Sequence, residues 1–496
     1  MSGTLKLPSR SLAEQTYFSM TKSLCRVCRK AVDAKIVFRG EEVFLDKFCP
    51  THGKEDVLVS SSVDWYLDAL SFIAPASPPF RPVTATTEAG CPFDCGPCAS
   101  HQQRVFLPVI PITSACNMSC PVCYTVNRNV DAYALSGEGL GRLLERLVED
   151  GTGRDILNFT GGEPTLHPDL LGLLRRSRDA GFRQLTVSTN GLRLLDEAYV
   201  TALAELDARI VLSLDTFRPA TDKALVGADT VEAKLKALDL LGKHGVATTI
   251  LPAVARGHND DEVGALLDLV LSRPHILSLE LHTLAFTGQG ATGFEKAARI
   301  TIPDLHARLA DATGGKISAL DFVPSPLAHP HCYSICYLLC LDGGGFIPLT
   351  RLMPRARLFD LLGTSLYLSP REELEEVFRE MIDTVWAEPE RFPEPDSILL
   401  TLRRLLSEIY PENGRALPLE VRQKRAERSI KAIYIHSHMD EASFDVGRVM
   451  KCCVGVPEED GTFIPTCSYN VLHREKDPRF TSPERVAAMQ AAREAR

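Results

Sequence analysis

The sequence contains no uninterrupted apolar run long enough to cross a membrane, and its first residues form no apolar region of the kind found in signal peptides. It also lacks the basic excess typical of general nucleic-acid binding, because its formal net charge is -9. No internal repeat or low-complexity tract is present. We therefore expect neither a membrane span nor a nucleic-acid partner.

Cysteine, by contrast, is abundant, with 15 cysteines in 496 residues. They fall in tight groups, which is typical of metal binding rather than of a disulfide framework. We therefore expect a reducing, cytoplasmic location. Charged residues make up 24% of the chain and hydrophobic residues 45%, an ordinary soluble profile, and the length allows two or three domains.

Three of these cysteines, Cys116, Cys120 and Cys123, follow a strand-like segment over residues 105–113. Their C-x3-C-x2-C spacing lets three thiolates surround one [4Fe–4S] cluster, which normally takes four cysteine ligands, so one iron would be open. The alternatives are a zinc knuckle or three unrelated core cysteines. The motif resembles the cluster loop of the radical S-adenosylmethionine (SAM) superfamily. In that superfamily the open iron chelates SAM, and one electron cleaves SAM to a 5′-deoxyadenosyl radical.

Residues 105–290 alternate between strand-like and helix-like segments. Strands are expected at 105–113, 156–160, 184–189, 208–214, 247–255 and 276–285, and helices at 170–180, 194–206, 231–244 and 260–272. This alternation predicts parallel strands joined by right-handed crossovers. Six such units resemble the α/β fold of radical SAM enzymes, a partial (β/α)6 barrel. In barrels of this kind the chemistry lies at the carboxyl ends of the strands.

Short motifs follow the second, third and fourth predicted strands, and each alone is often only a turn. The Gly-Gly-Glu-Pro turn matches the superfamily motif that contacts the amino group of SAM. The motif after the third strand occupies a position where superfamily members often contact the carboxylate or ribose of SAM, and the motif after the fourth strand occupies another usual SAM-side position. The resemblance thus implies the following SAM-binding residues: Gly161, Gly162, Glu163, Pro164, Ser188, Asn190, Ser213 and Asp215.

A separate ligand group lies near the N-terminus and consists of Cys25, Cys28, Cys49 and His52. Paired ligands separated by about 20 residues can enclose one tetrahedral metal. An alternating segment with a turn at Gly40 lies between the pairs and predicts a hairpin. We interpret residues 1–73 as a small ribbon that holds one zinc or iron ion, since both metals accept sulfur-rich tetrahedral sites.

A proline-rich connector over 74–82 leads to a second C-x3-C-x2-C group, formed by Cys91, Cys95 and Cys98. We interpret this group, within a linker over 74–104, as the loop of an auxiliary iron–sulfur cluster. The alternative is a redox-inert structural metal. The linker precedes the SAM barrel, which we assign to residues 105–290.

Further cysteines lie in a C-terminal α+β region, residues 291–496, and the predicted auxiliary ligands among them are Cys332, Cys336, Cys452, Cys453 and Cys467. Two auxiliary clusters need eight ligands. The residues Cys332, Cys336 and Cys340 recur at helical spacing, so buried core cysteines are the alternative for them. Adjacent cysteines do not easily hold one cluster, so Cys452 and Cys453 are expected to serve different clusters.

Helix is also expected over 368–409, followed by a basic stretch over 415–431. The basic residues would either touch anionic lipid headgroups or form an ordinary solvated helix face.

The layout as a whole resembles the tetraether lipid synthase family, together with relatives described as pterin methyltransferases. The matching stretches are residues 25–52, 91–98, 116–123, 161–165, 329–332 and 451–470. Relatives can carry cysteine where this chain has Leu327 and Ala328. The resemblance implies a ribbon metal, a SAM cluster, two auxiliary clusters and radical attack on unactivated C–H bonds. In the best-known case this attack couples lipid chains through a new C–C bond.

The sequence therefore predicts a radical SAM enzyme that joins alkyl chains of membrane lipids. Its expected partners are SAM, a lipid or other small-molecule substrate, an electron donor such as ferredoxin or flavodoxin, and, through peripheral contact, the membrane. One alternative is radical methylation of a pterin-like molecule, and another is an iron–sulfur electron-transfer protein. A peptide maturase is also open, although no leader-peptide domain is evident, and the segment before Cys25 is too short for a cobalamin domain.

Overall fold

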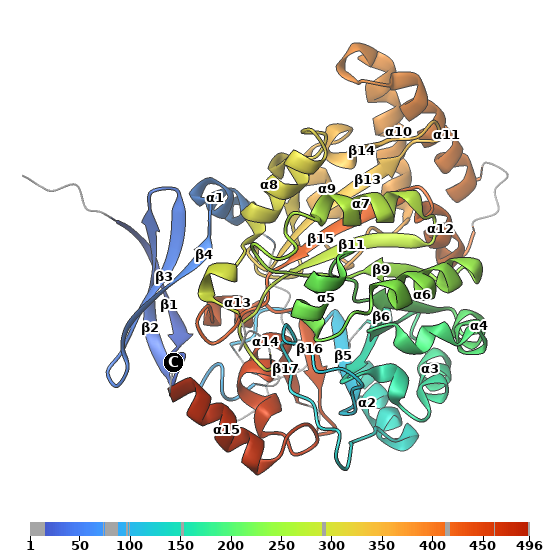
Figure 1. Cartoon of the computed structure of the whole chain (residues 1–496). Coiled ribbons are helices and arrows are strands. Elements are labelled where there is room, and N and C mark those ends of the chain that lie inside the picture. The colour runs from blue at the N-terminus through green and yellow to red at the C-terminus, as the bar shows by residue number, and fades with distance from the viewer. Residues whose placement is uncertain are drawn as a thin grey trace, which may run out of the picture.

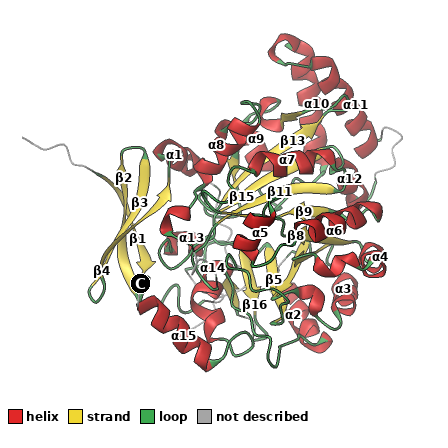
Figure 2. Ribbon diagram, viewed as in Figure 1, coloured by secondary structure: helices red, strands yellow, loops and turns green. Residues whose placement is uncertain are grey.

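The computed structural model describes residues 15–72, 74, 88–95, 98, 100–149, 153–289, 294–411, 417–460 and 462–494. In this part of the chain a small antiparallel ribbon lies beside one large mixed sheet with helices packed around it (Figures 1 and 2). Apart from residue 74, the connector predicted over 74–82 lies outside the described residues.

The ribbon consists of β1 (Thr16–Leu24), β2 (Ala31–Arg39), β3 (Glu42–Cys49) and β4 (Gly53–Ser60), paired antiparallel in this order and followed by α1 (Val63–Ser71). The predicted hairpin is present. Gly40 joins β2 to β3 with a φ of 58°, in the left-handed region that glycine adopts readily. Ile36 and Leu45 pack against Tyr66 of α1, which gives the ribbon a small core of its own.

The six strands predicted from the sequence are all present. They are β5 (Leu107–Thr113), β6 (Ile156–Gly161), β7 (Gln184–Thr189), β8 (Ala208–Leu212), β9 (Thr248–Ile250) with β10 (Ala253–Val254), and β11 (Ile276–Thr283). They pair in parallel and in chain order, as expected. The sheet has two edges, β12 and β17, rather than closing on itself. The α/β fold is therefore a partial barrel, which confirms the predicted fold class.

The predicted helices between these strands are α3 (Leu170–Asp179), α4 (Glu197–Glu205), α6 (Val231–Lys243) and α7 (Val263–Ser272). Two additional helices, α2 (Gly137–Glu149) and α5 (Pro219–Val226), lie in the same region. The apolar faces of these helices bury the sheet residues Phe159 and Ile210 together with Phe182 in one continuous core. Burial of this apolar surface stabilises the barrel and keeps the carboxyl ends of its strands at one rim.

The C-terminal region extends the same sheet on both sides. Next to β11 lies β15 (Ile430–His436), parallel to it, followed by antiparallel β13 (Tyr333–Cys340), with β12 (Val323–Pro324) and β14 (Phe346–Pro348) paired to β13. Next to β5 lies β16 (Val454–Pro457), paired in turn with β17 (Phe463–Pro465). The helical interpretation of the spacing among Cys332, Cys336 and Cys340 is therefore wrong. The run Tyr-Ser-Ile-Cys-Tyr-Leu-Leu is buried throughout, as in a central strand. Such a strand shows no alternation of polar and apolar residues, so the sequence pattern does not distinguish it from a helix.

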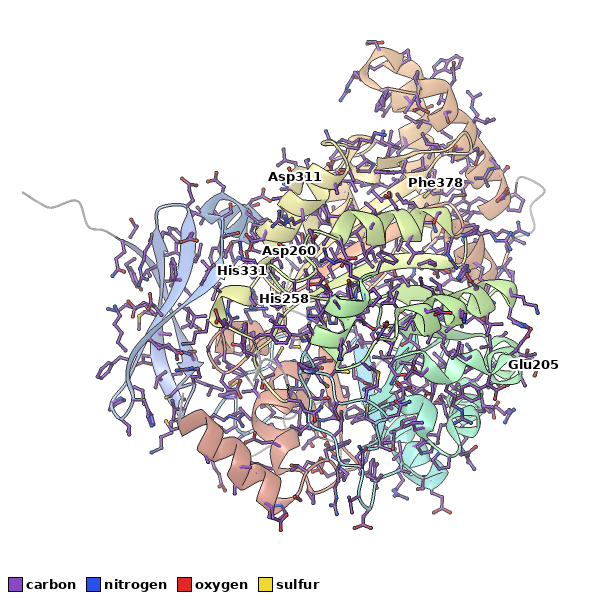
Figure 3. The ribbon with its side chains drawn as sticks, in the orientation of Figure 1. Glu205, His258, Asp260, Asp311, His331 and Phe378 are labelled. Carbon is purple, nitrogen blue, oxygen red and sulfur yellow. The ribbon has the colours of Figure 1, made fainter. Side chains whose placement is uncertain are left out.

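The remaining helices are α8 (Ile302–Ala312), α9 (Arg355–Leu361), α10 (Glu372–Ala387), α11 (Pro395–Ile409), α12 (Leu419–Ala426), α13 (Val446–Met450), α14 (Thr466–Ser468) and α15 (Pro483–Glu494). The helix predicted over 368–409 is the antiparallel pair α10 and α11, whose core includes Phe378 (Figure 3). In the described part of the chain, no helix combines the length and the apolar character that a membrane crossing requires.

Candidate active site

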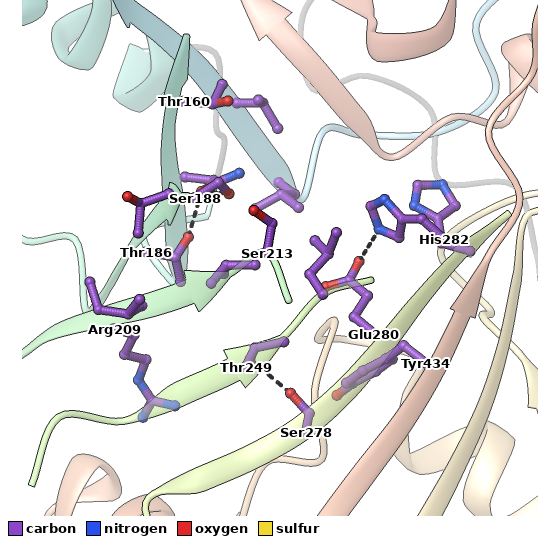
Figure 4. A pocket seen from close by; sticks show the side chains of 18 of the residues that line it. Thr160, Thr186, Ser188, Arg209, Ser213, Thr249, Ser278, Glu280, His282 and Tyr434 are labelled. Carbon is purple, nitrogen blue, oxygen red and sulfur yellow. Dashed lines mark hydrogen bonds and ion pairs between the residues drawn. The ribbon is translucent and has the colours of Figure 1, made fainter. Parts of the chain in front are cut away.

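A cavity of about 420 Å³ occupies the inside of the partial barrel (Figure 4). The three predicted cluster cysteines, Cys116, Cys120 and Cys123, lie at one end of this cavity, on the loop that follows the carboxyl end of β5. Most of the predicted SAM-binding residues line the same end, namely Gly161, Gly162, Glu163, Ser188, Asn190, Ser213 and Asp215. Pro164 is buried behind them at the start of a 3-10 turn, Pro164–Leu166. The sequence motifs thus converge at the carboxyl rim of the barrel.

The chemistry of the donor set fits an iron–sulfur cluster. Burial raises the pKa of Cys116 to about 11 and raises the pKa of Cys120 further, because a buried thiolate loses its hydration. Thiolates at these positions would need a cation beside them, which the iron of a bound cluster would supply. The backbone of Cys116 is fixed by its N–H, which donates to Asn129 Oδ1 at 2.8 Å. Asn190 Nδ2 donates to Asn117 Oδ1 at 2.7 Å and ties the turn after β7 to the cysteine loop.

Glu163 lines the cavity, and its carboxylate also joins two of the strand-end turns. Its carboxylate accepts hydrogen bonds from the Thr165 backbone and hydroxyl, from the Thr189 hydroxyl at 2.7 Å and from the Asn190 N–H at 2.7 Å. The side chain is buried, and burial raises the pKa of Glu163. The carboxylate therefore holds the turns after β6 and β7 in fixed positions around the SAM end of the cavity.

The two glycines before Glu163 are needed for a close approach within the protein. A Cβ at Gly161 would lie 2.3 Å from the Thr113 carbonyl oxygen, and a Cβ at Gly162 would lie 2.2 Å from that of Ala115. Gly161 also has a φ of 152°. The resemblance implied that these glycines contact SAM. The structure adds that they let the turn after β6 pack directly on the end of β5.

Asp215 belongs to a buried charged group that the sequence did not reveal. It accepts a hydrogen bond from the Ala253 N–H at 2.7 Å, and Lys234 Nζ lies 3.9 Å from its other oxygen and 3.7 Å from Asp222. Burial raises the pKa of Asp215. Lys234 lies in the first turn of α6, on the same face as the buried residues Val231, Ala237 and Leu241, and this spacing was the one signal in the sequence for its burial.

Arg474, in the C-terminal region, supports the SAM end of the cavity from behind its lining residues. It is buried, and its guanidinium donates to the carbonyls of Val126 and Gly161 and to Asn127 Oδ1, at 2.9 to 3.1 Å. Arg474 follows a π-helical turn, Tyr469–His473. The C-terminal segment thus holds both the cysteine loop and the Gly161 turn. Sequence reasoning missed this role, because the contact joins positions more than 300 residues apart.

The predicted auxiliary cysteines divide into separate places. Four of them line one small cavity beside the main one, and these are Cys332, Cys452, Cys453 and Cys467. Cys452 and Cys453, expected to serve different clusters, therefore face the same cavity. Arg448 Nε lies 3.4 Å from Cys332 Sγ within the same group. Cys336 instead packs in the barrel core with Leu338 and Ile433.

The loop with Cys91, Cys95 and Cys98 lies close to the C-terminal region. Cys91 packs against an apolar cluster that Cys467 also contacts, and Cys95 packs against the cluster around Tyr469 and Phe480. Residues 96, 97 and 99 lie outside the described part of the chain. The described residues bring this loop to the same end of the molecule as the four-cysteine cavity.

The four ribbon ligands converge on one point. Cys25 Sγ and Cys49 Sγ lie 3.4 Å and 3.5 Å from His52 Nδ1, and Cys28 Sγ lies 3.9 Å from Cys49 Sγ. Zn–S bonds of about 2.3 Å in a tetrahedron require donors about 3.8 Å apart. The donor set therefore fits a single tetrahedral zinc or iron ion.

The ribbon docks on the rest of the protein through buried charges. Lys47 Nζ donates to the carbonyls of Leu24, Glu441 and Ala442, and Arg29 pairs with Glu441 and Glu475. The contacted segment directly follows β15 and carries Asp440. The ribbon metal thus lies in a unit that supports the C-terminal part of the site.

Sequence reasoning also missed the histidines of the cavity. His282 at the end of β11, His436 at the end of β15 and His438 line the main cavity near the cysteine loop. The one available signal was the His-x-His pair that directly follows an apolar strand, since alternate residues of an extended chain point the same way.

Comparisons with known proteins agree with this geometry. The radical SAM superfamily model matches residues 110–270, and the model of the HMPTM N-terminal zinc ribbon domain matches residues 17–61. A Methanocaldococcus jannaschii protein named 7,8-dihydro-6-hydroxymethylpterin dimethyltransferase is 27% identical over 93% of this chain and 96% of its own length. A probable GTP 3',8-cyclase of Saccharolobus islandicus is 32% identical over 38% of this chain and 59% of its own length.

Among solved structures, Streptococcus suis SuiB bound to S-adenosylmethionine has a TM-score of 0.36 and 21% identity, covering 42% of this chain and 47% of that one. The anSMEcpe enzyme with bound AdoMet and Cp18Cys peptide has a TM-score of 0.32 and 17% identity, covering 66% and 95%. On the family match over the barrel, with its cysteine loop and strand-end turns, the chain is a radical SAM enzyme.

Proposed function

We propose that this radical SAM enzyme functionalises unactivated C–H bonds of a long apolar substrate and couples membrane-lipid alkyl chains through a C–C bond. The observation that carries the proposal is the depth of the cavity. Its lining includes both ends of β7, from Asn190 beside the cysteine loop to Gln184 at the opposite rim. Six strand residues at about 3.3 Å each give a depth of about 20 Å. An extended alkyl chain needs such depth, and a two-ring heterocycle does not.

The wall of the deep part suits an apolar substrate. Leu107, Val109, Ile210, Leu277, Ile335 and Leu368 contribute apolar surface there. Several hydroxyl groups of the wall are already paired within the protein. Thr186 and Ser188 donate to Asn158 Oδ1 at 3.0 and 3.1 Å, and Thr249 and Ser278 share a hydrogen bond of 2.8 Å (Figure 4). Because these hydroxyls have partners, they do not require polar groups from the substrate.

The deep end of the cavity meets α12, the predicted basic helix. Arg209 and Glu427 form a bidentate ion pair there at 2.8 and 3.0 Å. Lys424 and Arg428, on the same helix and just after it, are exposed. We propose that this basic surface makes the peripheral membrane contact and admits the lipid from a cytoplasmic location.

The chain's own residues would divide the work as follows. Cys116, Cys120 and Cys123 would hold the SAM-binding [4Fe–4S] cluster, which with SAM supplies a 5′-deoxyadenosyl radical for hydrogen abstraction. Glu163 and Arg474 keep the surrounding turns in place. The cavity inside the partial barrel limits the access of water, which would otherwise react with the radical intermediates. A ferredoxin or flavodoxin would supply electrons.

The four-cysteine cavity lined by Cys332, Cys452, Cys453 and Cys467 would hold an auxiliary cluster. Three residues, Tyr333, His436 and Val454, line both this cavity and the main one. A cluster there would therefore lie beside the substrate. The loop with Cys91, Cys95 and Cys98 would contribute to a second auxiliary cluster, and the ribbon would hold one zinc or iron ion.

The test is anaerobic incubation of reconstituted protein with SAM, dithionite and a lipid extract, followed by mass spectrometry. We expect 5′-deoxyadenosine together with lipids that have lost two hydrogens for each coupling. Replacing all three SAM-loop cysteines by alanine should abolish both products. 5′-Deoxyadenosine without any new lipid would refute the substrate proposal, and undiminished 5′-deoxyadenosine in the cysteine variant would refute the role of the loop.

The second candidate is radical methylation of a pterin. The printed name of the M. jannaschii relative, which is similar over nearly its whole length, favours it. Incubation with 7,8-dihydro-6-hydroxymethylpterin and SAM that carries a CD3 group decides between the two. A labelled methyl group on the pterin, with no change in the lipids, would establish methylation.

A further inference from the structure

Three imidazoles meet inside the cavity, within reach of one another. The strands β11 and β15 are parallel neighbours, and their register pairs His282 with His436. His438 follows two residues later. One ring nitrogen from each of the three histidines lies within 4.8 Å of those of the other two. Apart from the ribbon ligands, no other described group of histidine, cysteine and carboxylate side chains meets this criterion.

Aromatic neighbours hold the rings in place. His436 stacks on Tyr333 with 3.9 Å between ring centroids, and His438 stacks on Tyr124 at 4.9 Å. Tyr124 directly follows Cys123, so the histidine group lies beside the SAM-cluster loop. Fixed ring planes are what a preorganised ligand set requires.

The hydrogen bonds of the group leave lone pairs unused. His438 Nε2 is buried and has no hydrogen-bond partner among the described residues. His282 Nε2 lies 2.9 Å from Glu280 Oε1, which is how a carboxylate orients a metal-binding imidazole.

We propose that His282, His436 and His438 bind a divalent first-row metal ion of the zinc or iron(II) class. Three imidazoles and no thiolate suit these ions. Three protein ligands leave a coordination position open, as in catalytic rather than structural zinc sites. The open position, at the end of the cavity nearest the SAM loop, would be filled by a water molecule or another oxygen ligand. The metal site does not depend on whether the substrate is a lipid or a pterin.

The rival assignment is that His438 ligates the neighbouring auxiliary cluster, since its Nδ1 lies 3.8 Å from Cys467 Sγ. The two assignments differ in sulfide content. A histidine that holds only a mononuclear ion can be replaced without loss of cluster sulfide, whereas a cluster ligand cannot.

The test uses the reconstituted full chain, treated with a chelator and titrated with Zn²⁺, with zinc and acid-labile sulfide measured. We expect the double variant His436→Gln and His438→Gln to bind one zinc fewer per chain than the unchanged protein, at equal sulfide. His244→Gln, which changes a histidine far from the cavity, should match the unchanged protein. Equal zinc in the double variant, or loss of sulfide in step with zinc, would overturn the proposal.

Two further measurements guard against a folding defect. Glu280→Gln keeps all three imidazoles and should weaken zinc binding about 10- to 100-fold with full sulfide. In a Cys25→Ser, Cys28→Ser background, X-ray absorption at the zinc edge should show imidazole nitrogen at about 2.0–2.1 Å and no sulfur. Unchanged zinc affinity in the Glu280 variant, or sulfur in the zinc shell of the ribbon variant, would also overturn the site.

Discussion

Asp440 provides the sharpest test of how the C-terminal segment holds the site together. This buried carboxylate accepts hydrogen bonds from Arg299 Nη2 at 2.7 Å, from the Phe286 N–H at 3.0 Å, and from the Ser443 N–H and hydroxyl at 2.8 Å each. It thereby ties the loop after β11 to the segment that follows His438. We predict that Asp440→Asn loosens both, because an amide of the same shape cannot accept all of these hydrogen bonds.

The loss of stability expected for this variant follows from the pKa of Asp440. Burial alone would raise the pKa of Asp440, but Arg299 and the N–H groups of Phe286 and Ser443 lower it to about 2. Against an ordinary value of 3.8, the ionised form stabilises the fold by about 2 kcal/mol. The contribution is fully present above the unfolded-state pKa and is lost as pH falls through 2. Between pH 5.5 and 8, the deficit of the asparagine variant should therefore be constant.

Hydrogen exchange measures this loss where it occurs. A deficit of about 2 kcal/mol should speed exchange of the Phe286 and Ser443 amides roughly 30-fold, if these amides exchange by local opening. Asp311→Asn is the matched control, because that carboxylate is exposed, and it should leave exchange at both amides unchanged. Acceleration below about fivefold, or a deficit that grows between pH 5.5 and 8, would refute the reasoning.

Three further predictions concern the cavity, the SAM turns and the ribbon. Ser278→Leu, which fills the deep cavity, should reduce lipid coupling at least tenfold while 5′-deoxyadenosine still forms, whereas Ser272→Leu on the exposed end of α7 should change neither; equal coupling by both would rule out the deep cavity as the substrate site. Arg474→Gln should lower the free energy of unfolding by about 2–3 kcal/mol and slow SAM cleavage, because it leaves buried carbonyls unpaired; unchanged cleavage would show that the turns hold without it. Cys25→Ser with Cys28→Ser should remove about one metal per chain without loss of sulfide, with lower solubility and persistent SAM cleavage; sulfide lost in step with iron would make the ribbon a cluster site.

The sequence was sufficient for whatever depends on local pattern. The parallel strands follow from apolar runs separated by helical segments, and the convergence of Cys116 with Glu163 and Ser213 follows from their places at strand ends. The ribbon site follows from the spacing of its ligands, since one hairpin brings them together.

What the sequence could not provide depends on pairings between distant segments. His282 lies beside His436 only because β15 pairs with β11, and the sequence near either strand does not predict the register of that pairing. Residues 333–340 form a strand although Cys332, Cys336 and Cys340 recur at helical spacing, because a fully buried strand shows no alternation, and Cys336 lies in the core, as the alternative of buried core cysteines expected. Lys234 and Arg474 have no distinctive neighbours in sequence. Their roles come from buried carboxylates and carbonyls elsewhere in the fold.

The placement of β16 and Arg474 also constrains how the protein is made. The barrel begins with β5. The strand that pairs with β5, β16, and the residue that donates to the Gly161 carbonyl, Arg474, are synthesised more than 300 residues later. Chains emerge from the ribosome at about 5–20 residues per second. The cysteine loop is therefore outside the ribosome for tens of seconds before β16 and Arg474 are available to pack against it. During that interval its thiols are open to oxygen and stray metal. Cluster insertion into this enzyme should therefore follow release of residue 474, and production at low temperature, low oxygen and abundant sulfide should raise the fraction of protein that carries its clusters.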